Sequence, residues 1–437
     1  DLAIFAPALK SWRRTFYIEG NAKGPLDNFS AKDMKIRSGN SYVEGNIAMR
    51  GLPDINTTFI DFQSKQLRTN YAEMVSIIPQ LRNIETPAIS KLGAVSFKGN
   101  FTGFIRDFVA FGTFNTALGI VTADVNMKTP TGRPPAYSGN LLSPGFNIGA
   151  FLRNPDLGNI ALNTKVSGTG FNTNELSVKV DGKVNAFSFR GYNYQNLLIN
   201  GDFNRNLFVG HFSIDDPNLK ITSMDGALDL TAKSPGFKLQ ALVQRANFKQ
   251  LGFSSSNLSF SGNLDLNFTG KNIDNFLGDA QIYNAVLLKD STKLSFDRLS
   301  VRSQLINGKK SLTLQSNEID ASIIGDFQIA EMPDAVKVLL AKYYPTYIQA
   351  PRYIVKSRQN FDFTINTKNV DQYIKLLDPK LGGFNNANIA GYFDLQNYDL
   401  KLKATIPQFT YAGKTFTNTE VNGTGTRDTL IADIAVE

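Results

Sequence analysis

The feature that most constrains the fold is a period-two alternation of apolar and polar residues, which sends successive side chains to opposite faces of a β-strand. The clearest run extends from Leu258 to Phe268. There the apolar residues share one face with Gly262, while serine, asparagine and aspartate occupy the other. Shorter runs repeat the pattern at Leu176-Val178-Val180-Val184, Leu312-Leu314, Phe361-Phe363-Ile365, Ile389-Phe393-Leu395 and Leu400-Leu402-Ala404-Ile406. We therefore predict a mostly β chain in which each strand has one apolar and one solvated face.

A second repeat places glycine in the apolar register, with an apolar residue two positions before and two positions after it. It occurs at Gly45, Gly99, Gly182, Gly201, Gly210, Gly226, Gly262, Gly325 and Gly391. Glycine weakens a strand and usually marks a bulge, a bend or a close approach, so its recurrence indicates a sheet that curls tightly with these glycines on the concave face. Bulge sites in a stacked sandwich remain the alternative.

Asp-Gly and Asn-Gly pairs are also hairpin signals. Gly182, Gly201 and Gly226 are assigned to strand interiors, because the apolar period continues through them without a change of phase. Asn307-Gly308, Asn422-Gly423 and Gly382-Gly383 are expected at turns.

Few helices are expected, and they are interpreted as caps over exposed apolar edges. One begins at Met332-Pro333-Asp334 and is closed by Pro345, and a second lies around Asn70 to Leu81. A strand followed by an Asn-apolar step and a short helical turn recurs at Phe146–Leu152, Ala246–Gly252 and Lys368–Leu377. The pattern predicts one continuous repeat-built segment over residues 1–437, with approximate repeat units 1–92, 93–160, 161–255, 256–350 and 351–437.

Composition argues against an enzyme and against a metal or other cofactor. The chain has no cysteine and one histidine, which excludes thiolate chemistry and multi-histidine metal sites. His211 falls in the polar register and is interpreted as a solvated strand residue, and Asp215-Asp216-Pro217-Asn218 as a turn rather than a Ca²⁺ loop. The net charge is +8, but the cations are scattered, so we expect surface solubilisation and no nucleic-acid partner.

Neither a signal peptide nor an apolar stretch of roughly 18 residues, the length a spanning helix needs, is visible. The sequence opens and closes within strand-like patterns, so we expect an internal fragment of a longer protein.

Together the glycine-bearing strands and the strand-to-helix step resemble the AsmA-like superfamily, and within it the TamB-like branch of diderm bacteria. The run from Phe146-Asn147-Ile148-Gly149 through Leu157-Gly158 to Val166-Ser167-Gly168-Thr169-Gly170 carries the resemblance most clearly. It implies an all-β fold with a few short helices, in which an elongated, curved antiparallel sheet forms an open half-tube (a β-taco) with an apolar interior groove. It also implies a periplasmic protein whose parent chain is anchored in the inner membrane and reaches the outer membrane.

From this resemblance we expect a bridge-like conduit that moves phospholipids between the inner and outer membranes, with a role in outer-membrane biogenesis and protein assembly. A BamA-like (TamA-type) outer-membrane barrel is the implied protein partner, and segments outside this sequence would make the membrane contact. We predict that the alternating apolar residues line the groove. The candidates are Val178, Val180, Phe208, Phe212, Ile214, Leu258, Phe260, Leu264, Leu266, Phe268, Phe361 and Phe363.

Two other architectures share the alternation. An outer-membrane β-barrel also alternates over strands of roughly ten residues. A structural β-solenoid or adhesin without lipid transport would instead bury its apolar face completely against itself.

Overall fold

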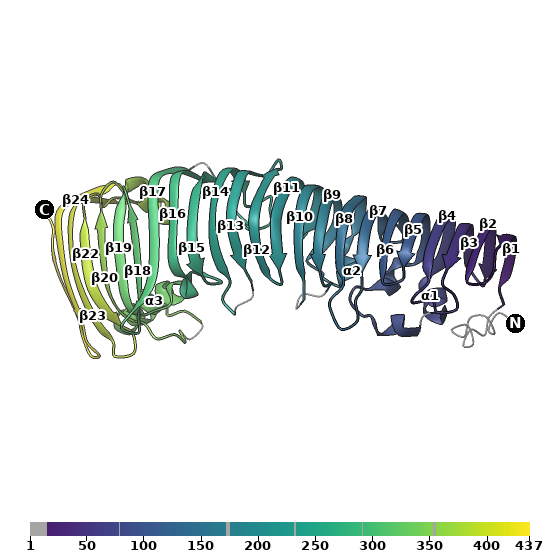
Figure 1. The fold of residues 1–437 in the computed structure, drawn as a ribbon. Coiled ribbons are helices and arrows are strands. Elements are labelled where there is room, and N and C mark those ends of the chain that lie inside the picture. Colours follow the sequence, from purple (N-terminus) through teal and green to yellow (C-terminus); the bar gives the residue numbers. More distant parts are fainter. Residues whose placement is uncertain (1–14, 78, 172–174, 231–232, 291, 353–354) are drawn as a thin grey trace. The chain divides into compact units, whose positions relative to one another are not determined.

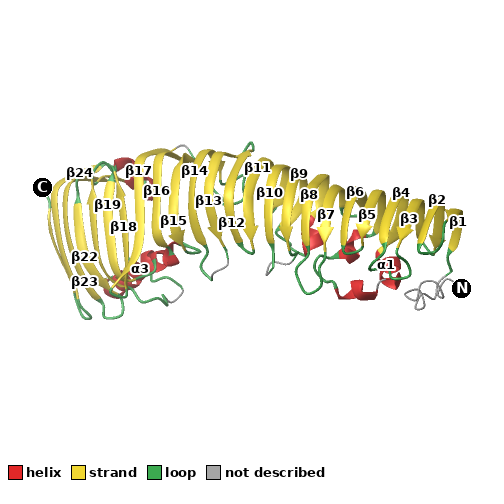
Figure 2. Ribbon diagram, in the orientation of Figure 1, coloured by secondary structure: helices red, strands yellow, loops and turns green. Residues whose placement is uncertain are grey.

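A computed structural model describes residues 15–77, 79–171, 175–230, 233–290, 292–352 and 355–437. The chain divides into two units, Asp1–Leu219 and Lys220–Glu437. The division falls inside the expected repeat unit 161–255, and the five repeat units themselves remain a prediction. Strands dominate both units, and the helices are short (Figure 2).

In the described part of the first unit, twelve strands follow one another along the sheet, each paired antiparallel with the next (Figure 1). Their bounds are β1 Tyr17–Lys23, β2 Asn28–Ser38, β3 Ser41–Arg50, β4 Phe59–Asn70, β5 Ala94–Phe104, β6 Asp107–Thr116, β7 Gly119–Lys128, β8 Ala136–Asn147, β9 Leu157–Thr169, β10 Ser177–Phe189, β11 Tyr192–Asn204 and β12 Leu207–Asp215. At about 4.8 Å between neighbours, twelve strands extend on the order of 50 Å across the sheet.

The second unit has the same organisation. Its strands are β13 Leu219–Asp229, which begins at the boundary, then β14 Gly236–Asn247, β15 Leu258–Thr269, β16 Leu277–Lys289, β17 Thr292–Ile306, β18 Lys309–Ser316, β19 Ile319–Asp326, β20 Asn360–Thr367, β21 Leu381–Gly383, β22 Asn388–Asp394, β23 Asp399–Tyr411, β24 Lys414–Gly425 and β25 Leu430–Ala435. From β14 to β20 each strand pairs antiparallel with the next. The sheet then continues from β20 through β22 and β23 to β25, and the short β21 pairs with the end of β23.

The predicted fold class is confirmed within each unit: the sheet is antiparallel, curved and open, with one apolar face. Bulges contribute to the curvature because an extra residue bends the bulged strand. The pairing register shifts at bulges in β2 and β16, where Asp33 and Asn284 adopt φ values of 50° and 47°. Neither residue is glycine, but Asp and Asn tolerate this left-handed conformation better than most residues.

The helices lie near strand ends (Figure 2). In the first unit they are α1 Tyr71–Ile77, α2 Ile148–Leu152 and the 3₁₀ turns η3 Pro79–Asn83 and η4 Ile89–Leu92. In the second they are α3 Met332–Tyr343, α4 Asp371–Leu377 and the 3₁₀ turns η5 Ile273–Asn275 and η6 Ile329–Glu331. The helix predicted from Met332 is confirmed by α3. The one predicted around Asn70 to Leu81 is broken into α1 and η3, and residue 78 between them lies outside the described residues.

Two of the three predicted strand-to-helix steps contain helices, α2 and α4. The third, Ala246–Gly252, has the predicted turn after its strand but does not extend into a helix. Leu251 N donates to Asn247 O at 3.0 Å, which makes one turn, but Gly252 then adopts φ +79° and the chain leaves the helical path.

Some of the predictions for the glycine-containing pairs are confirmed and others are wrong. Gly182, Gly201 and Gly226 lie inside strands as predicted, and Asn307-Gly308 forms the β17–β18 turn. Asn422-Gly423 was expected at a turn but lies within β24, because Asn422 and Gly423 pair with Lys403 and Leu402 of β23. Gly382-Gly383 likewise lies in β21 rather than in a turn.

A compact core occurs where α3 crosses the sheet of the second unit. The buried residues Ala335 and Leu339 of α3 pack in one cluster with Phe361 of β20 and Phe393 of β22. Leu339 is 1% exposed and Ala335 is fully buried. Pro333 in the first turn, Asp334 beside it and Lys342 in the last turn suit the helix ends and the helix dipole.

Candidate functional site

The apolar face of each sheet is the candidate site. In the first unit its side chains meet across neighbouring strands as close aromatic pairs. The ring centroids of Phe97 and Phe114 are 4.6 Å apart, and those of Phe203 and Phe208 are 4.8 Å apart. Such contacts between adjacent strands cover the backbone beneath them with hydrocarbon.

The predicted lining residues of the first unit share this face. Val178 and Val180 of β10 stand opposite Phe203 and Gly201 of β11. On β12, the predicted lining residues Phe208, Phe212 and Ile214 stand opposite Phe203, Ile199 and Leu197 of β11. The register of the ladder therefore brings these five predicted positions into one patch.

The predicted lining residues of the second unit form two patches. Leu264, Leu266 and Phe268 of β15 stand opposite Ala241, Leu239 and Phe237 of β14. Phe260 and Leu258 continue the same face toward the start of β15, where they stand opposite Leu287 and Lys289. Phe361 and Phe363 of β20 form a separate patch with Phe393 and Gly391 of β22.

The degree of burial distinguishes a lining from a core. Nine of the twelve predicted residues are half-buried, and three are buried, namely Phe208, Ile214 and Phe361. Lateral neighbours on one sheet cover the flanks of a side chain but leave its tip accessible, whereas a second packed layer buries it fully. The half-buried majority indicates that neighbours along the sheet give these residues most of their cover.

The predicted glycines lie in this register at strand interiors, and two pairs face each other across strands. Gly99 stands opposite Gly112, and Gly201 opposite Gly210. A Cβ built on Gly210 would come within 2.5 Å of the Gly201 Cα atom. The ring of Phe208 lies over Gly201, and the ring of Phe97 lies over Gly112. Aromatic rings thus fill the gaps that the missing side chains leave.

At other positions the backbone itself requires glycine. Gly182 and Gly325 adopt φ values of +155° and +153°, a conformation that residues with a Cβ avoid. A Cβ on either would also meet backbone of the adjacent strand, 2.6 Å from the Cα atoms of Thr164 and Phe361 respectively. The remaining predicted glycines also have a neighbouring strand too close for a Cβ, namely Gly45, Gly99, Gly226, Gly262 and Gly391.

Sequence reasoning missed several residues of the apolar face. Phe97 and Phe101 flank a predicted glycine and could have been found from that spacing, whereas Leu400 and Leu402 had the alternation but were not selected. The contribution of α3 has no counterpart in a strand pattern, because only the fold places Leu339 against β20 and β22.

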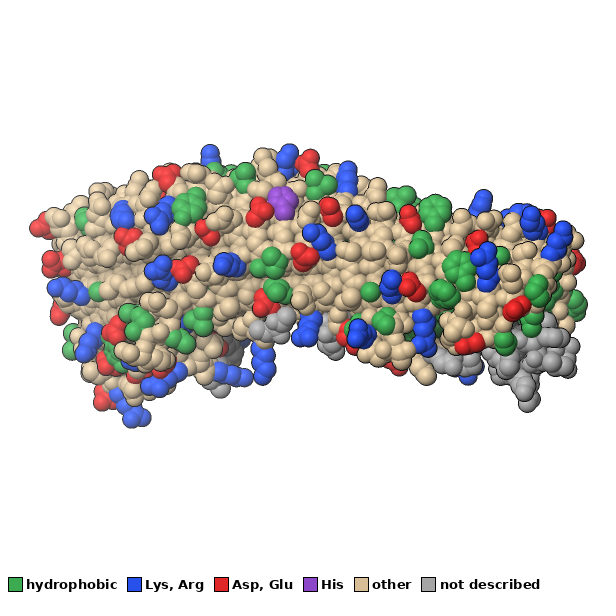
Figure 3. Space-filling model, in the orientation of Figure 1, with side chains coloured by type: hydrophobic (Ala, Val, Ile, Leu, Met, Phe, Trp, Pro, Cys, Tyr) green, Lys and Arg blue, Asp and Glu red, His purple; other side chains and the backbone are tan. Residues whose placement is uncertain are grey.

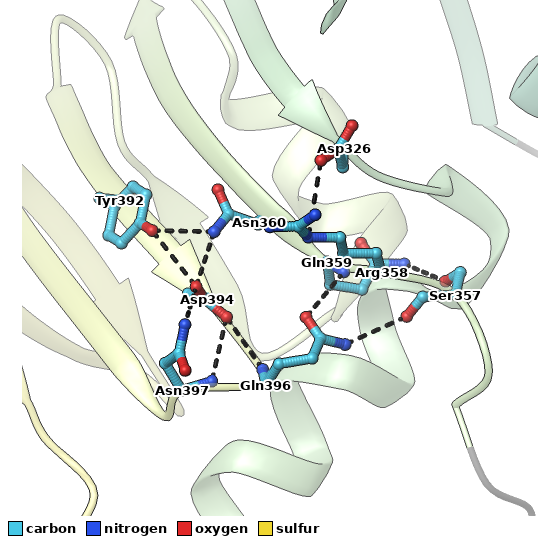
Figure 4. Close-up of polar contacts among 9 residues, drawn as sticks. All are labelled: Asp326, Ser357, Arg358, Gln359, Asn360, Tyr392, Asp394, Gln396 and Asn397. Atoms are coloured by element: carbon cyan, nitrogen blue, oxygen red, sulfur yellow. Dashed lines mark hydrogen bonds and ion pairs between the residues drawn. The ribbon is translucent and has the colours of Figure 1, made fainter.

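A buried polar network lies at the strand ends beside α3 (Figure 4). Asp394, 2% exposed, accepts hydrogen bonds from the Asn360 side chain at 2.6 Å and from the backbone N–H groups of Gln396 and Asn397 at 3.0 and 3.1 Å. Burial alone would raise the pKa of Asp394, but these bonds stabilise the carboxylate and hold its pKa below the usual 3.8. Fully buried Gln359 donates to Gln328 O and to Ser357 Oγ.

The residues that the sequence analysis weighed for catalysis or metal binding lie on the polar face of β12 and in the turn that follows it. His211 is exposed and lies on the polar face of β12, as its register predicted. The Asp216 carboxylate accepts hydrogen bonds from the Asn218 backbone N–H at 2.8 Å and from the Tyr192 hydroxyl at 2.5 Å. These bonds stabilise the turn that was predicted for Asp215–Asn218. Within the ranges described, no group of three His, Asp or Glu side chains is placed to hold a metal ion. On the face in view in Figure 3, Lys and Arg are interspersed with Asp and Glu.

A helix that crosses a bilayer needs a run of about 20 predominantly apolar residues. Among the described residues, no helix is long and apolar enough to cross a bilayer.

Comparison of the chain with protein-family models, with curated proteins and with solved structures found no match. The chain can therefore be classified only by its own fold and apolar face. In each unit this protein is an open, curved antiparallel sheet, whose broad apolar face is only half-buried by its own side chains.

Proposed function

We propose that this chain is a segment of a bridge-like conduit along which phospholipids move between the inner and outer membranes of a diderm bacterium. One observation carries the proposal: in each unit the predicted lining residues share the apolar face of an open sheet, and most of them stay half-buried rather than packed under a second layer. A structural solenoid or adhesin would bury that face against itself, so the half-buried lining favours the conduit over that alternative.

The physical need for such a surface is large. Each CH₂ group that leaves an apolar environment for water costs about 0.8 kcal/mol, so a lipid with two acyl chains cannot cross an aqueous space unaided. An apolar lining removes most of that barrier, because the tails exchange one hydrocarbon contact for another. Transport of this kind needs no nucleophile, acid or metal.

The arrangement of glycines and aromatic rings supports sliding rather than tight capture. Aromatic rings lie over Gly112, Gly201 and Gly391 and present flat hydrocarbon surfaces on the apolar face. Where rings cover the face in this way, successive positions offer similar contacts, so a bound tail has no strong preference for one of them.

The cellular context of the proposal rests on the resemblance to the TamB-like branch. It comprises a periplasmic location, an inner-membrane anchor on the parent chain, a role in outer-membrane biogenesis and a BamA-like barrel partner. Each of these goes beyond the described residues and their fold.

Site-specific photocrosslinking in cells tests the conduit. A photoreactive amino acid at Phe260 or Leu264, on the apolar face of β15, should yield phospholipid adducts detected by mass spectrometry. The matched positions Ser261 and Asn263 alternate with them on the same strand and face the other side. Adducts at all four positions, or at none of them, would contradict the proposal.

A further inference from the structure

The helix α3 and the 3₁₀ turn η6 that precedes it extend along the strand ends of the second unit. At the start of η6, Asp274 in the β15–β16 connection accepts hydrogen bonds from the backbone N–H groups of Ile329 and Ala330, at 2.6 and 3.3 Å. At the other end, Tyr343 donates its hydroxyl hydrogen to the carbonyl of Thr426, which begins the β24–β25 turn. The segment is therefore fixed at both ends to strand connections.

Additional contacts hold each end. Lys342 donates to the carbonyl of Arg427, and its ammonium group lies 3.9 Å from the centroid of the Tyr398 ring. Near the other end, Glu331 accepts hydrogen bonds from the backbone N–H and the hydroxyl group of Ser357, at 3.0 and 2.5 Å.

Between these fixed ends, α3 roofs a cavity of about 410 Å³. The floor is the apolar face of β19, β20, β22 and β23, and the roof is the apolar stripe of the helix. Val336 and Leu339 contribute from α3, and Ala321, Phe363 and Leu402 contribute from the sheet. The cavity therefore lies on the same face that forms the candidate conduit.

The chemistry of the lining limits the ligand. All twelve residues that line the cavity are Ala, Ile, Val, Leu, Met or Phe, so no side chain offers a hydrogen bond. A peptide inserted here would leave its N–H and C=O groups without partners, at a large desolvation cost. Hydrocarbon has no such groups and suits this site.

The volume indicates how much hydrocarbon fits. A cavity of about 150 Å³ accommodates the six carbons of benzene, so 410 Å³ corresponds to on the order of 16 carbons. That amount matches one long acyl chain rather than the two tails of a typical phospholipid.

We propose that α3 clamps a single acyl chain against the sheet of the second unit, and that this cavity is a discrete binding site within the lining. The inference rests on the proposed function for its biological ligand, since one tail of a transported phospholipid would occupy the site while the second tail stays on the open face. A free fatty acid presents the same chain, so the two sources share one recognition chemistry.

Fluorescence quenching tests the site directly. Val336 is 42% exposed and lines the cavity, so Val336→Trp in a Trp12→Phe background gives a single reporter on the roof. Brominated palmitate should quench this reporter in a saturable manner with one-to-one stoichiometry. Absence of saturable quenching would overturn the inference.

A filling variant identifies the cavity as the place of binding. Ala321→Phe, added to the reporter, places a ring in the cavity and should weaken palmitate binding at least about tenfold. Ala280→Phe adds the same ring to the same face on β16, outside the cavity lining, and should leave affinity within about twofold. Equal affinities in the two variants would contradict the clamp.

A second blocking variant keeps the test valid if Ala321→Phe fails to fold. Leu340→Lys, added to the reporter, puts a charge on the cavity roof from a partly exposed position on α3, and it should also weaken binding. Full-affinity binding by this variant, with thermal unfolding unchanged, would overturn the inference.

Two further experiments distinguish a failure of the acyl-chain site from a failure of the proposed conduit. A phospholipid with one brominated tail should quench the reporter as palmitate does, whereas quenching by palmitate alone would assign the cavity to free fatty acids. Lipid crosslinking at Ile199, on the apolar face of the first unit, reports on the conduit independently. If Ile199 gives no lipid adducts while the cavity still binds palmitate, the conduit proposal fails and the acyl-chain site stands.

Discussion

The ring of Phe208 on β12 lies over Gly201 on β11, so that a Cβ at residue 201 would fall 2.8 Å from the Phe208 Cζ atom. The Val209 carbonyl oxygen would be equally close to that Cβ. Glycine at 201 is thus required by a neighbouring ring and a neighbouring strand together. The contact explains why an apolar strand face repeatedly contains a residue with no side chain.

Gly201→Ala should lower the free energy of unfolding by about 1–3 kcal/mol, because the ring must leave its place or the strands must separate. Urea unfolding measures the change. Gly145→Ala is the matched control, since Gly145 lies in β8 of the same unit and a Cβ there meets nothing within 4 Å. Equal destabilisation by both variants would show that the contacts specific to Gly201 are not responsible.

The pairing of Phe208 with Gly201 also predicts non-additivity. In a Phe208→Leu background, which removes the ring, Gly201→Ala should cost less than it does in the native chain, although the Val209 carbonyl still opposes it. A double-mutant cycle on the same urea measurements gives the coupling. Strict additivity would mean that the backbone contact alone demands glycine.

Much of this geometry was predictable because strand alternation is a local property of sequence. The spacing of Leu264 and Leu266 alone predicts the strand face on which they lie. The apolar alternation continues unchanged through Gly182, which correctly placed that glycine inside a strand rather than in a hairpin turn. The same Asn-Gly signal failed at Asn422-Gly423, where pairing with β23 outweighs local turn preference. Local chemistry cannot reveal which strand will be the partner.

The clamp could not be predicted for a related reason. The amphipathic pattern of α3 is visible in the sequence, but its contact partners Phe361 and Phe393 lie many residues further along the chain. The polar network around Asp394 joins segments that are equally distant, through Asn360. Contacts of this kind follow from topology, which periodicity does not specify.

Leu264→Asp should reduce phospholipid transfer at least about tenfold, since a passing tail would have to displace the water that solvates the new carboxylate. The fold should persist because Leu264 is only half-buried. Transfer of a fluorescent phospholipid between vesicles, with circular dichroism on the same samples, measures both effects. Asn263→Asp adds the same charge on the opposite face of the same strand and should leave transfer unchanged; equal inhibition by both variants would contradict a role for the apolar face.

Asp394→Asn should lower the free energy of unfolding by about 2 kcal/mol at neutral pH, because an amide NH₂ then replaces one carboxylate oxygen and faces either the Asn360 side-chain donor or the backbone N–H groups of Gln396 and Asn397. Asp362→Asn, at an exposed position on β20, is the control and should have little effect.

The same carboxylate predicts a pH dependence with a defined sign. The folded pKa of Asp394 lies below its ordinary 3.8, so its stabilisation is fully present above that pH and is lost as the pH falls through the folded value. The stability difference between the native chain and Asp394→Asn should therefore shrink below pH 3.8. A difference that stays constant down to about pH 2 would show that the charge of Asp394 is not what stabilises the turn.

Lys342→Ala combined with Tyr343→Phe should release the C-terminal end of α3, because the two changes remove both hydrogen bonds to the β24–β25 turn and the ammonium group over Tyr398. These groups are largely exposed, so a combined loss of about 1 kcal/mol is expected, and α3 amides should exchange with solvent roughly fivefold faster. Hydrogen exchange with mass spectrometry measures this locally. Lys337→Ala, which removes only a 3.8 Å surface contact with Asp334 on the same helix, should leave exchange unchanged. If release of this end speeds exchange in α3 but leaves β20 and β22 protected, the helix opens as a unit over a stable floor, which is the motion a clamp on an acyl chain requires.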